Sequence, residues 1–485
     1  MKKRAIHWFR SDLRLTDNTA LHALEKELSD KANCIGVFVM SDPDEGKWAM
    51  GAASKWWLHH SLTSLQSDLA EIEVPLVILH GVASKELARF AKSVKADYLF
   101  YNHRHEPWAS KQEIAVEQEL EKIGVECFSF HDGLLIEPAN LLNKTGGPYK
   151  VFTPFWNACL AHFDRQGVPL PKPKFGKIIK GTKFDTIDYS SSVFKKELND
   201  LHLIPRIKWY GGMQEFWQPG EAGAHKRLSK FVNKSISKYD TGRDRPGDSD
   251  VSYISPHLHF GEISTRQIWH RAIEHDSKST QIYLREIGWR DFAHYLLHFF
   301  PQTTDEPLQT SFASFPWRTD NGSLEKWQKG LTGFPIVDAG MRQLWHLGWM
   351  HNRVRMIVAS FLAKDLLLPW QTGANWFWDT LVDADLANNT LGWQWTAGCG
   401  ADAAPFFRIF NPVLQGEKFD PEGTYIKEWV PELSKLNKKW IHKPHEAPPL
   451  ELQMAGVILG ETYPKPIVDH SAARQRALQA LKSTK

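Results

Sequence analysis

The sequence predicts an α/β domain followed by an all-α domain, and two observations support this prediction. Up to about residue 135, short apolar runs alternate with helix-like segments. From about residue 205 onward, apolar residues recur with the period of a helix. The chain has 485 residues, enough for two or three domains, each with its own hydrophobic core.

The first domain, expected over residues 1–135, is a Rossmann-like parallel sheet built from βα units. Its strands are expected in the runs AIHWF, CIGVFVM, VPLVILHG, YLFYNH and VECFSFH. The segment after the first run, RSDLRLTDN, has neither the glycines of a dinucleotide-binding fingerprint nor those of a P-loop. The fold class alone therefore identifies no ligand.

Residues 136–204 are rich in Pro, Gly and Lys, as in NKTGGPYK and GVPLPKPKFGK, and are expected to connect the two domains. Residues 205–485 form the second domain. Its helices are expected in STRQIWHRAIEH, TQIYLREIGWRDFAHYLLHFF, IVDAGMRQLWHLGW and HNRVRMIVASFLAKDLLL, with SAARQRALQALKSTK as a surface helix.

Composition narrows the class of protein. Four cysteines lie far apart without a CxxC pair, so neither a disulfide framework nor a zinc site is indicated. No export signal and no run of 18 apolar residues is present, and we expect a cytoplasmic protein without a membrane span. The net charge is only +3, so any binding to nucleic acid must come from a local basic patch.

The stretch DADLANNTLGWQW, residues 383–395, combines carboxylates, amides and tryptophans. Asp383 and Asp385 do not begin an EF-hand, because Ala387 and Asn388 stand where that loop needs an oxygen ligand and a glycine. We therefore expect no metal.

Tryptophan is unusually frequent, with 21 residues. On a helix Trp393 and Trp395 would project about 200° apart and meet different partners. A lone tryptophan most often fills a core. A chain of rings would instead suit electron hopping, and the candidates are Trp317, Trp370, Trp376, Trp378 and Trp393.

Two helical segments carry polar residues at informative spacings. In GWMHNRVRM, Asn352 and Met356 share one face, while His351 and Arg355 share another. A buried Arg355 would need a carboxylate, and Asp383 is available; the alternative is a weak surface ion pair.

In YLREIGWRDF, Glu286 and Trp289 share a face, which places a carboxylate acceptor beside a stacking ring. That pairing suits an aromatic heterocycle with N–H donors. The loop KYDTGRDRPGDSDVSYISPHLHFGEIS, residues 238–264, supplies N–H and O–H donors suited to phosphate, although a capped loop would look the same.

Together these segments resemble the photolyase and cryptochrome family of flavin proteins, over nearly the whole chain. The resemblance rests on HWFRSDLRLTDNTAL, ASKWWLHHSL, YDTGRDRP, SPHLHFGEIS, GFPIVDAGMRQLWHLGWMHNRVRM, DADLANNTLGWQW, RIFNP, GEKFDPEGTYI and WVPELSKL. The segments ASKWWLHHSL, PIVDAGM and WFWDTLVDADL are most similar to plant cryptochromes and to class III cyclobutane pyrimidine dimer (CPD) photolyases.

The resemblance implies an α/β antenna domain followed by a helical domain that binds FAD. It implies hydroxyl contacts to the phosphates, an Arg355–Asp383 pair beside the isoalloxazine ring, and Asn389 facing N5. Val251 departs from the Thr or Ser of many relatives. The implied FAD-binding residues are Tyr239, Ser252, Tyr253, Ile254, Ser255, Tyr283, Glu286, Arg355, Asp383, Asp385 and Asn389.

Plant cryptochromes carry Asp at the position of Asn389. A neutral amide does not repel an anionic reduced flavin, so Asn389 favours repair chemistry. Trp393, Trp370 and Trp317 match the family's electron-transfer triad, and with Glu286 and Asn389 they are the expected catalytic residues. Trp376 and Trp378 are candidates for a branch.

The resemblance also implies a pocket for a flipped pyrimidine dimer. Enzymes that repair the (6-4) photoproduct carry a histidine pair where this chain reads His351, Asn352 and Arg353, which argues against that lesion. The residues expected to bind the lesion are Glu286, Trp289, Asn352, Arg353, Met356 and Trp395.

We therefore expect a monomeric enzyme that repairs UV-damaged DNA in blue light. Its antenna is expected to be 5,10-methenyltetrahydrofolate, with Trp108, Glu106 and Asp44 as candidate contacts. One alternative is a cryptochrome-type photoreceptor without repair activity; the roughly 40 residues after WIHKPHEAPP lack the extended tail usual in receptors. Another is a module that stacks single-stranded DNA or RNA on the same aromatic rings.

Overall fold

The computed structural model describes residues 3–28, 33–163, 167–175 and 197–483. Its N-terminal part is a five-stranded parallel sheet in the order β3-β2-β1-β4-β5. The strands coincide with the five apolar runs of the sequence, and the predicted fold class is confirmed. They are β1 (Arg4–Phe9), β2 (Asn33–Met40), β3 (Leu76–His80), β4 (Tyr98–Asn102) and β5 (Glu126–Phe130).

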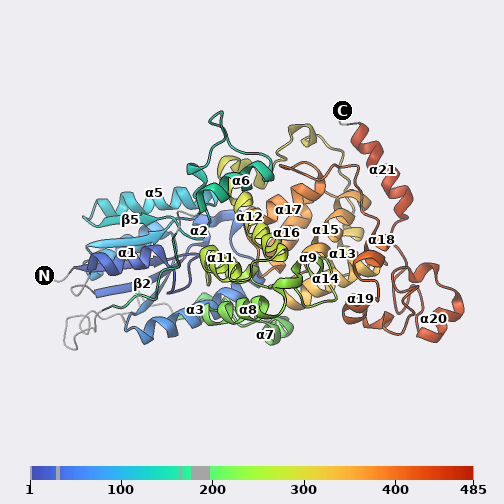
Figure 1. The fold of residues 1–485 in the computed structure, drawn as a ribbon, viewed down its shortest axis with the longest axis horizontal. Helices are drawn as coiled ribbons and strands as arrows, with labels where there is room; N and C mark the ends of the chain where they lie inside the picture. Colours follow the sequence, from blue (N-terminus) through green and yellow to red (C-terminus); the bar gives the residue numbers. More distant parts are fainter. Residues whose placement is uncertain (1–2, 29–32, 164–166, 176–196, 484–485) are drawn as a thin grey trace.

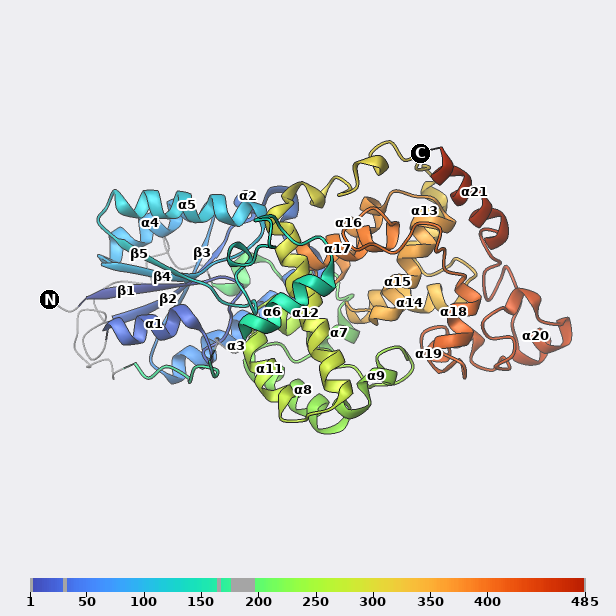
Figure 2. The same ribbon diagram turned by 45° about the horizontal axis from the view of Figure 1, so that its top comes forward.

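Helices cover both faces of this sheet (Figures 1 and 2). Because parallel strands are connected by crossovers, each face of the sheet is buried under helices. Val37, Leu99 and Tyr101 on one face are almost wholly buried in a cluster of their own. The helices of this domain are α1 (Thr19–Leu28), α2 (Asp42–Glu45), α3 (Ala52–Glu71), α4 (Ala83–Val94) and α5 (Pro107–Glu121).

The strand order reverses between β1 and β4, where doubly wound sheets commonly bind a ligand. Polar side chains that bond to one another occupy this crevice. Asn102 donates to Asp12 over 2.7 Å, and Arg10 donates to Gln112 over 2.8 Å and pairs with Glu113.

The remaining helices form the second part of the molecule, with α12 lying between the sheet and the bundle (Figure 2). They are α6 (Phe152–Phe163), α7 (Gly211–Phe216), α8 (Glu221–Lys234), α9 (Tyr239–Gly242), α10 (Ser255–His259), α11 (Thr265–Ile273), α12 (Lys278–Phe299), α13 (Asn321–Gln328), α14 (Pro335–Leu347), α15 (Asn352–Ser360), a π-helix (Phe361–Asp365), α16 (Trp370–Thr380), α17 (Leu386–Ala397), α18 (Pro412–Phe419), α19 (Thr424–Trp429), α20 (Pro449–Ala455) and α21 (His470–Lys482). Among the described residues no helix has both the length and the apolar character needed to cross a bilayer.

The two parts share a core. Trp57 of α3 packs with Phe260 and Trp217, and its indole N–H donates to buried Glu262 over 3.0 Å. The connector expected over 136–204 includes helix α6, which carries Phe152 and Phe155 into a cluster with α12. Part of that connector, 164–166 and 176–196, lies outside the described residues.

Glu45, buried near the junction, makes stability depend on pH. Burial raises its pKa to about 7, although the Arg104 guanidinium opposes the shift. The folded state therefore holds this proton more tightly than the unfolded chain, and Glu45 reduces stability as pH rises from the usual carboxyl range through about 7.

We expect Glu45→Gln to raise the free energy of unfolding by about 2 kcal/mol near pH 8 and by almost nothing near pH 4. Urea unfolding at the two pH values measures the difference. An equal effect at both values would show that the substitution acts through packing rather than through the charge.

Candidate active site

A cavity of about 530 Å³ opens where the loop after α9 meets α12, α15 and α17. The structure brings 16 of the residues singled out in the sequence to its wall. They are Tyr239, Ser252, Tyr253, Ile254, Ser255, Tyr283, Glu286, Trp289, Asn352, Arg355, Met356, Asp383, Asp385, Asn389, Trp393 and Trp395. The other three predicted site residues, Arg353, Trp370 and Trp317, do not line this cavity.

The loop between α9 and α10 forms one wall. Asp250 holds its base by accepting from Ser235 over 2.9 Å and pairing with Lys238. Tyr253 adopts a left-handed backbone with φ of 52°, a conformation that costs energy for a side chain of this size. The conformation presents Ser252 and Ser255 to the cavity, and Val251 adds apolar contacts rather than a hydroxyl.

An ion pair crosses the floor of the cavity. The Arg355 guanidinium donates to both oxygens of Asp383, over 3.0 and 2.8 Å, and the Asp383 side chain is only 3% exposed. Ser255 donates to the same carboxylate over 2.6 Å. The pair is therefore partly buried and fixed by further hydrogen bonds, unlike a solvent-exposed surface pair.

Asp385 begins helix α17. Its side chain accepts from the backbone N–H of Asn388 over 2.8 Å, and His294 and His259 lie 3.1 and 3.8 Å from its other oxygen. Burial would raise the pKa of Asp385, but the two histidines outweigh it and hold the pKa well below the usual range. One turn further on, Asn389 donates to the Ala374 carbonyl over 2.9 Å.

Glu286 faces the cavity from α12 and pairs with Arg243 over 2.6 Å. Burial raises the pKa of Glu286, and Arg243 opposes that shift. Next to it, Trp289 stacks on Phe152 at 3.8 Å and 7°, so that one face of the indole ring is supported by α6. Neither Arg243 nor Phe152 was predicted from the sequence as a site residue. The only local signal for Arg243 was its place in YDTGRDRP.

Helix α15 places Asn352 at the exposed rim and turns His351 inward. His351 is 1% exposed and caps the helix by accepting from the N–H of Arg353 over 3.2 Å. Burial lowers the pKa of His351 to about 3, so the ring is neutral at physiological pH.

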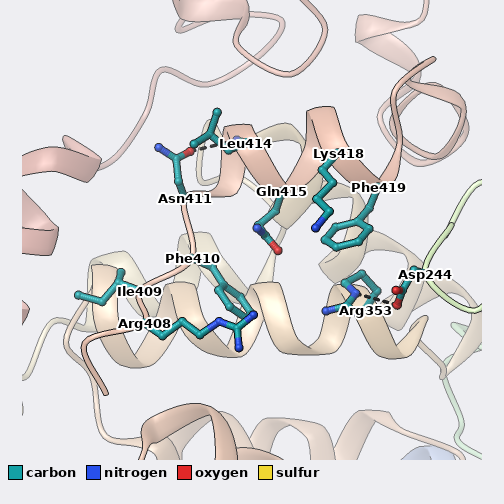
Figure 3. A pocket seen from close by; sticks show the side chains of 10 residues that line it. All are labelled: Asp244, Arg353, Arg408, Ile409, Phe410, Asn411, Leu414, Gln415, Lys418 and Phe419. Atoms are coloured by element: carbon teal, nitrogen blue, oxygen red, sulfur yellow. Dashed lines mark hydrogen bonds and ion pairs between the residues drawn. The ribbon is translucent and has the colours of Figure 1, made fainter. Parts of the chain in front are cut away.

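Arg353 points away from the central cavity into an adjoining groove of about 440 Å³ (Figure 3). It pairs with Asp244 over 2.5 Å and lies 4.4 Å from the ring centre of Phe419. The other lining residues are Arg408, Ile409, Phe410, Asn411, Leu414, Gln415 and Lys418. Several of these residues belong to the motifs RIFNP and GEKFDPEGTYI, for which the sequence predicted no role.

The candidate tryptophans of the electron path share one cluster. Trp393 and Trp370 are buried in it, and Trp317, Trp376 and Trp378 pack against it. Trp376 also stacks on half-exposed Trp345 at 6.1 Å, and Trp378 donates to the Ala49 carbonyl over 2.9 Å. Trp393 and Trp395 both line the cavity.

The candidate antenna contacts lie in the α/β domain. Arg104 donates to Glu106 and stacks over Trp108 at 4.6 Å. Asp44 accepts from Gln112 and from the N–H of Ala83, over 2.9 Å each.

Comparisons with known proteins agree with this architecture. Residues 5–174 match the DNA photolyase family, and residues 283–483 match the FAD binding domain of DNA photolyase. The deoxyribodipyrimidine photo-lyase of Agrobacterium fabrum is 45% identical over 99% of this chain and 98% of its own length. Cryptochrome-1 of Arabidopsis thaliana is 37% identical over 98% of this chain and 70% of its own length.

Among solved structures, that of a bacterial class III photolyase from Agrobacterium tumefaciens matches with a TM-score of 0.93 and 44% identity, over 100% of this chain and 98% of that one. Both halves of the chain, in sequence and in fold, thus match the same group of proteins. The chain belongs to the photolyase and cryptochrome family.

Proposed function

We propose that the chain is a deoxyribodipyrimidine photo-lyase of class III, which repairs cyclobutane pyrimidine dimers in DNA under blue light. The observation that carries the proposal is the cavity itself. It sets an acceptor and two indole rings, Glu286, Trp289 and Trp395, beside the residues assigned to FAD. The identity of 45% to a photolyase over nearly the full length supports the same function.

The cavity wall fits FAD in the chemistry of its donors. Ser252 and Ser255 supply hydroxyls suited to phosphate, and Tyr253 holds the strained backbone often found at ligand sites. When bound and reduced, FAD donates an electron to the dimer on excitation and takes it back after the cyclobutane bonds split. Arg355 adds positive charge near the ring, and Asn389 adds no negative charge that would oppose the reduced form.

The side chains at the mouth suit a dimer flipped out of the duplex. Trp289 is held rigid by Phe152 and forms an apolar wall with Trp395. Glu286 accepts hydrogen bonds from pyrimidine N–H groups, and Asn352 reaches the rim, while Met356 adds apolar surface. The neutral, inward His351 is a poor proton donor for (6-4) chemistry, which favours the dimer.

The groove beside the cavity is suited to the DNA strand. Arg353, Arg408 and Lys418 supply positive charge, and Asn411 and Gln415 supply amides. From the sequence, Arg353 could contact either bases or phosphate. A phosphate contact fits it better, because its guanidinium lies in this groove. Such a local patch is needed in a chain whose net charge is only +3.

The finer assignments follow the same proposal. We propose a monomer with a methenyltetrahydrofolate antenna on the α/β domain near Trp108. Arg104 already neutralises Glu106, so Trp108 is the better candidate for contact with a pigment. The four cysteines form no disulfide, which fits a reducing compartment such as the cytoplasm.

A cryptochrome photoreceptor is the second candidate function, and the likeness to the Arabidopsis cryptochrome favours it.

Light-dependent repair tests the proposal directly. Purified, chemically reduced protein is mixed with an oligonucleotide that carries a thymine dimer and is illuminated with blue light. We expect repair of the dimer in light, none in the dark, and none of a (6-4) oligonucleotide. A flavin-loaded protein that repairs neither lesion would move the assignment to a photoreceptor.

Glu286→Ala tests the lesion pocket. Loss of a charged acceptor is expected to weaken dimer binding by about 10-fold, on the scale of one such hydrogen bond. FAD content should stay unchanged, and Glu286→Gln, which keeps an acceptor oxygen, should lose less. Glu325→Ala, at an exposed ion pair with Lys329, is the control. Unaltered binding in Glu286→Ala would remove this residue from the pocket.

Trp393→Phe tests the electron path. Phenylalanine is much harder to oxidise than tryptophan, so photoreduction of the oxidised flavin should slow by at least about 10-fold, a barrier increase of roughly 1.4 kcal/mol. Repair by protein that is already reduced should persist. Transient absorption measures the first rate, and equal rates in the two proteins would exclude Trp393 from the path.

A further inference from the structure

A row of titratable side chains crosses the junction of the two domains and ends in the central cavity. Its outer end is a second, polar cavity of about 100 Å³, lined by His131, Asp132, Glu137 and Arg266 among others. That volume holds about three water molecules. The inner end is Asp385, which lines the cavity assigned to FAD.

Two of the four steps between the ends are within hydrogen-bond distance, and the two on either side of His105 are longer. His131 Nδ1 lies 2.6 Å from Glu137 Oε2, and the same oxygen lies 3.9 Å from His105 Nε2. The rings of His105 and His294 meet edge to face, with centroids 6.2 Å apart. His294 Nε2 then lies 3.1 Å from Asp385 Oδ2. Neither ring nitrogen of His294 has a hydrogen bond of standard geometry to any residue in the described ranges.

Exposure falls along the row. The side chain of His131 is 55% exposed, and those of Glu137, His105 and His294 are nearly buried. The hydrogen bond to Glu137 raises the pKa of His131, whereas burial lowers the pKa of His105 to about 4. The outer ring therefore takes up protons readily, and the inner one releases them readily.

Other groups around His294 do not offer an equivalent route. Glu106 is paired with Arg104, which holds its pKa at about 2 against burial, so it stays ionised. Arginine does not release its proton in proteins. The titratable groups that interact with His294 are His105 and Glu106 from the α/β domain, Asp291 from its own helix, and Asp385 at the start of α17. His298 of the same helix interacts with His105, and His259 of α10 interacts with Asp385.

We propose that His131, Glu137, His105 and His294 form the path by which protons reach the flavin cavity. This inference rests on the proposed function. Conversion of oxidised FAD to the reduced anion consumes two electrons and one proton. An external thiol supplies the electrons, through Trp393. Asn389 has no acidic proton to give, so the proton must enter from outside.

The transfer balances at each station. A proton from bulk water binds His131, and Glu137 takes it and passes it to His105 Nε2. His105 releases the proton of its Nδ1 to His294, which releases one from Nε2 to Asp385 Oδ2 and so to the cavity. Each imidazole gains a proton on one nitrogen and loses one from the other, and each carboxylate gains and loses one proton, so the charge of every station is the same before and after the transfer.

Glu137→Gln interrupts this path with almost no change of shape, because an amide forms hydrogen bonds but does not carry a proton. Two measurements are made on the flavin-loaded protein. The first is the exchange of the His294 ring proton with water in the dark, by ¹⁵N NMR with His294→Gln for assignment. The second is photoreduction by an external thiol. We expect both to slow by at least about 10-fold, the lower part of the range for a lost proton carrier.

The control is Glu25→Gln, at a similar carboxylate 3.5 Å from His22 but remote from the cavities; it should change neither rate. His105→Phe is a second variant that removes the next station. Unchanged exchange and photoreduction in Glu137→Gln would overturn the path. Repair by protein reduced beforehand needs no net proton, so its absence would overturn the proposed function alone, while the exchange measurement still tests the path.

Discussion

Two buried carboxylates in one turn, Asp383 and Asp385, hold the helices around the cavity together. Asp383 binds Arg355 of α15 and Ser255 of α10. Asp385 caps α17 and faces His294 of α12. Removing one partner of such a buried pair leaves an uncompensated charge, which typically costs about 3–5 kcal/mol. Four helices distant in sequence therefore depend on a turn of three residues for their relative positions.

Much of the fold could be predicted from the sequence because its signals are local. The inner parallel strands are buried on both faces and appear as apolar runs, as in CIGVFVM for β2, whereas β5 at the edge of the sheet is partly exposed. The carboxylates, amides and rings of residues 383–395 also indicated a site, since such groups are unusual together. What the sequence did not reveal are contacts between distant segments. Phe152 supports Trp289 from 137 positions away, and Arg353 meets Asp244 from 109 positions away.

Arg353 shows why the direction of a side chain is harder to predict than its position. The sequence placed it in the same helical segment as Asn352 and Arg355 but did not show what it faces. The answer depends on YDTGRDRP, whose consecutive residues Arg243 and Asp244 point to different sites. Arg243 meets Glu286 in the cavity, and Asp244 meets Arg353 in the groove. A shift in this short segment would thus change the charge of the central cavity and of the adjoining groove together.

In the proposed mechanism, electrons and protons reach the cavity through different kinds of side chain. The cluster of Trp393 and Trp370 is built of buried apolar residues, which suits electron transfer between rings. The junction between the domains is instead rich in imidazoles and carboxylates. The hydrogen bond to Glu137 raises the pKa of His131, burial lowers that of His105, and two histidines lower that of Asp385 against the effect of burial. A site that takes up both electrons and a proton uses both the apolar cluster and the polar junction. In this proposal the α/β domain, placed against α12, contributes to the chemistry of the helical domain by supplying His131 and His105, and the connector contributes Glu137.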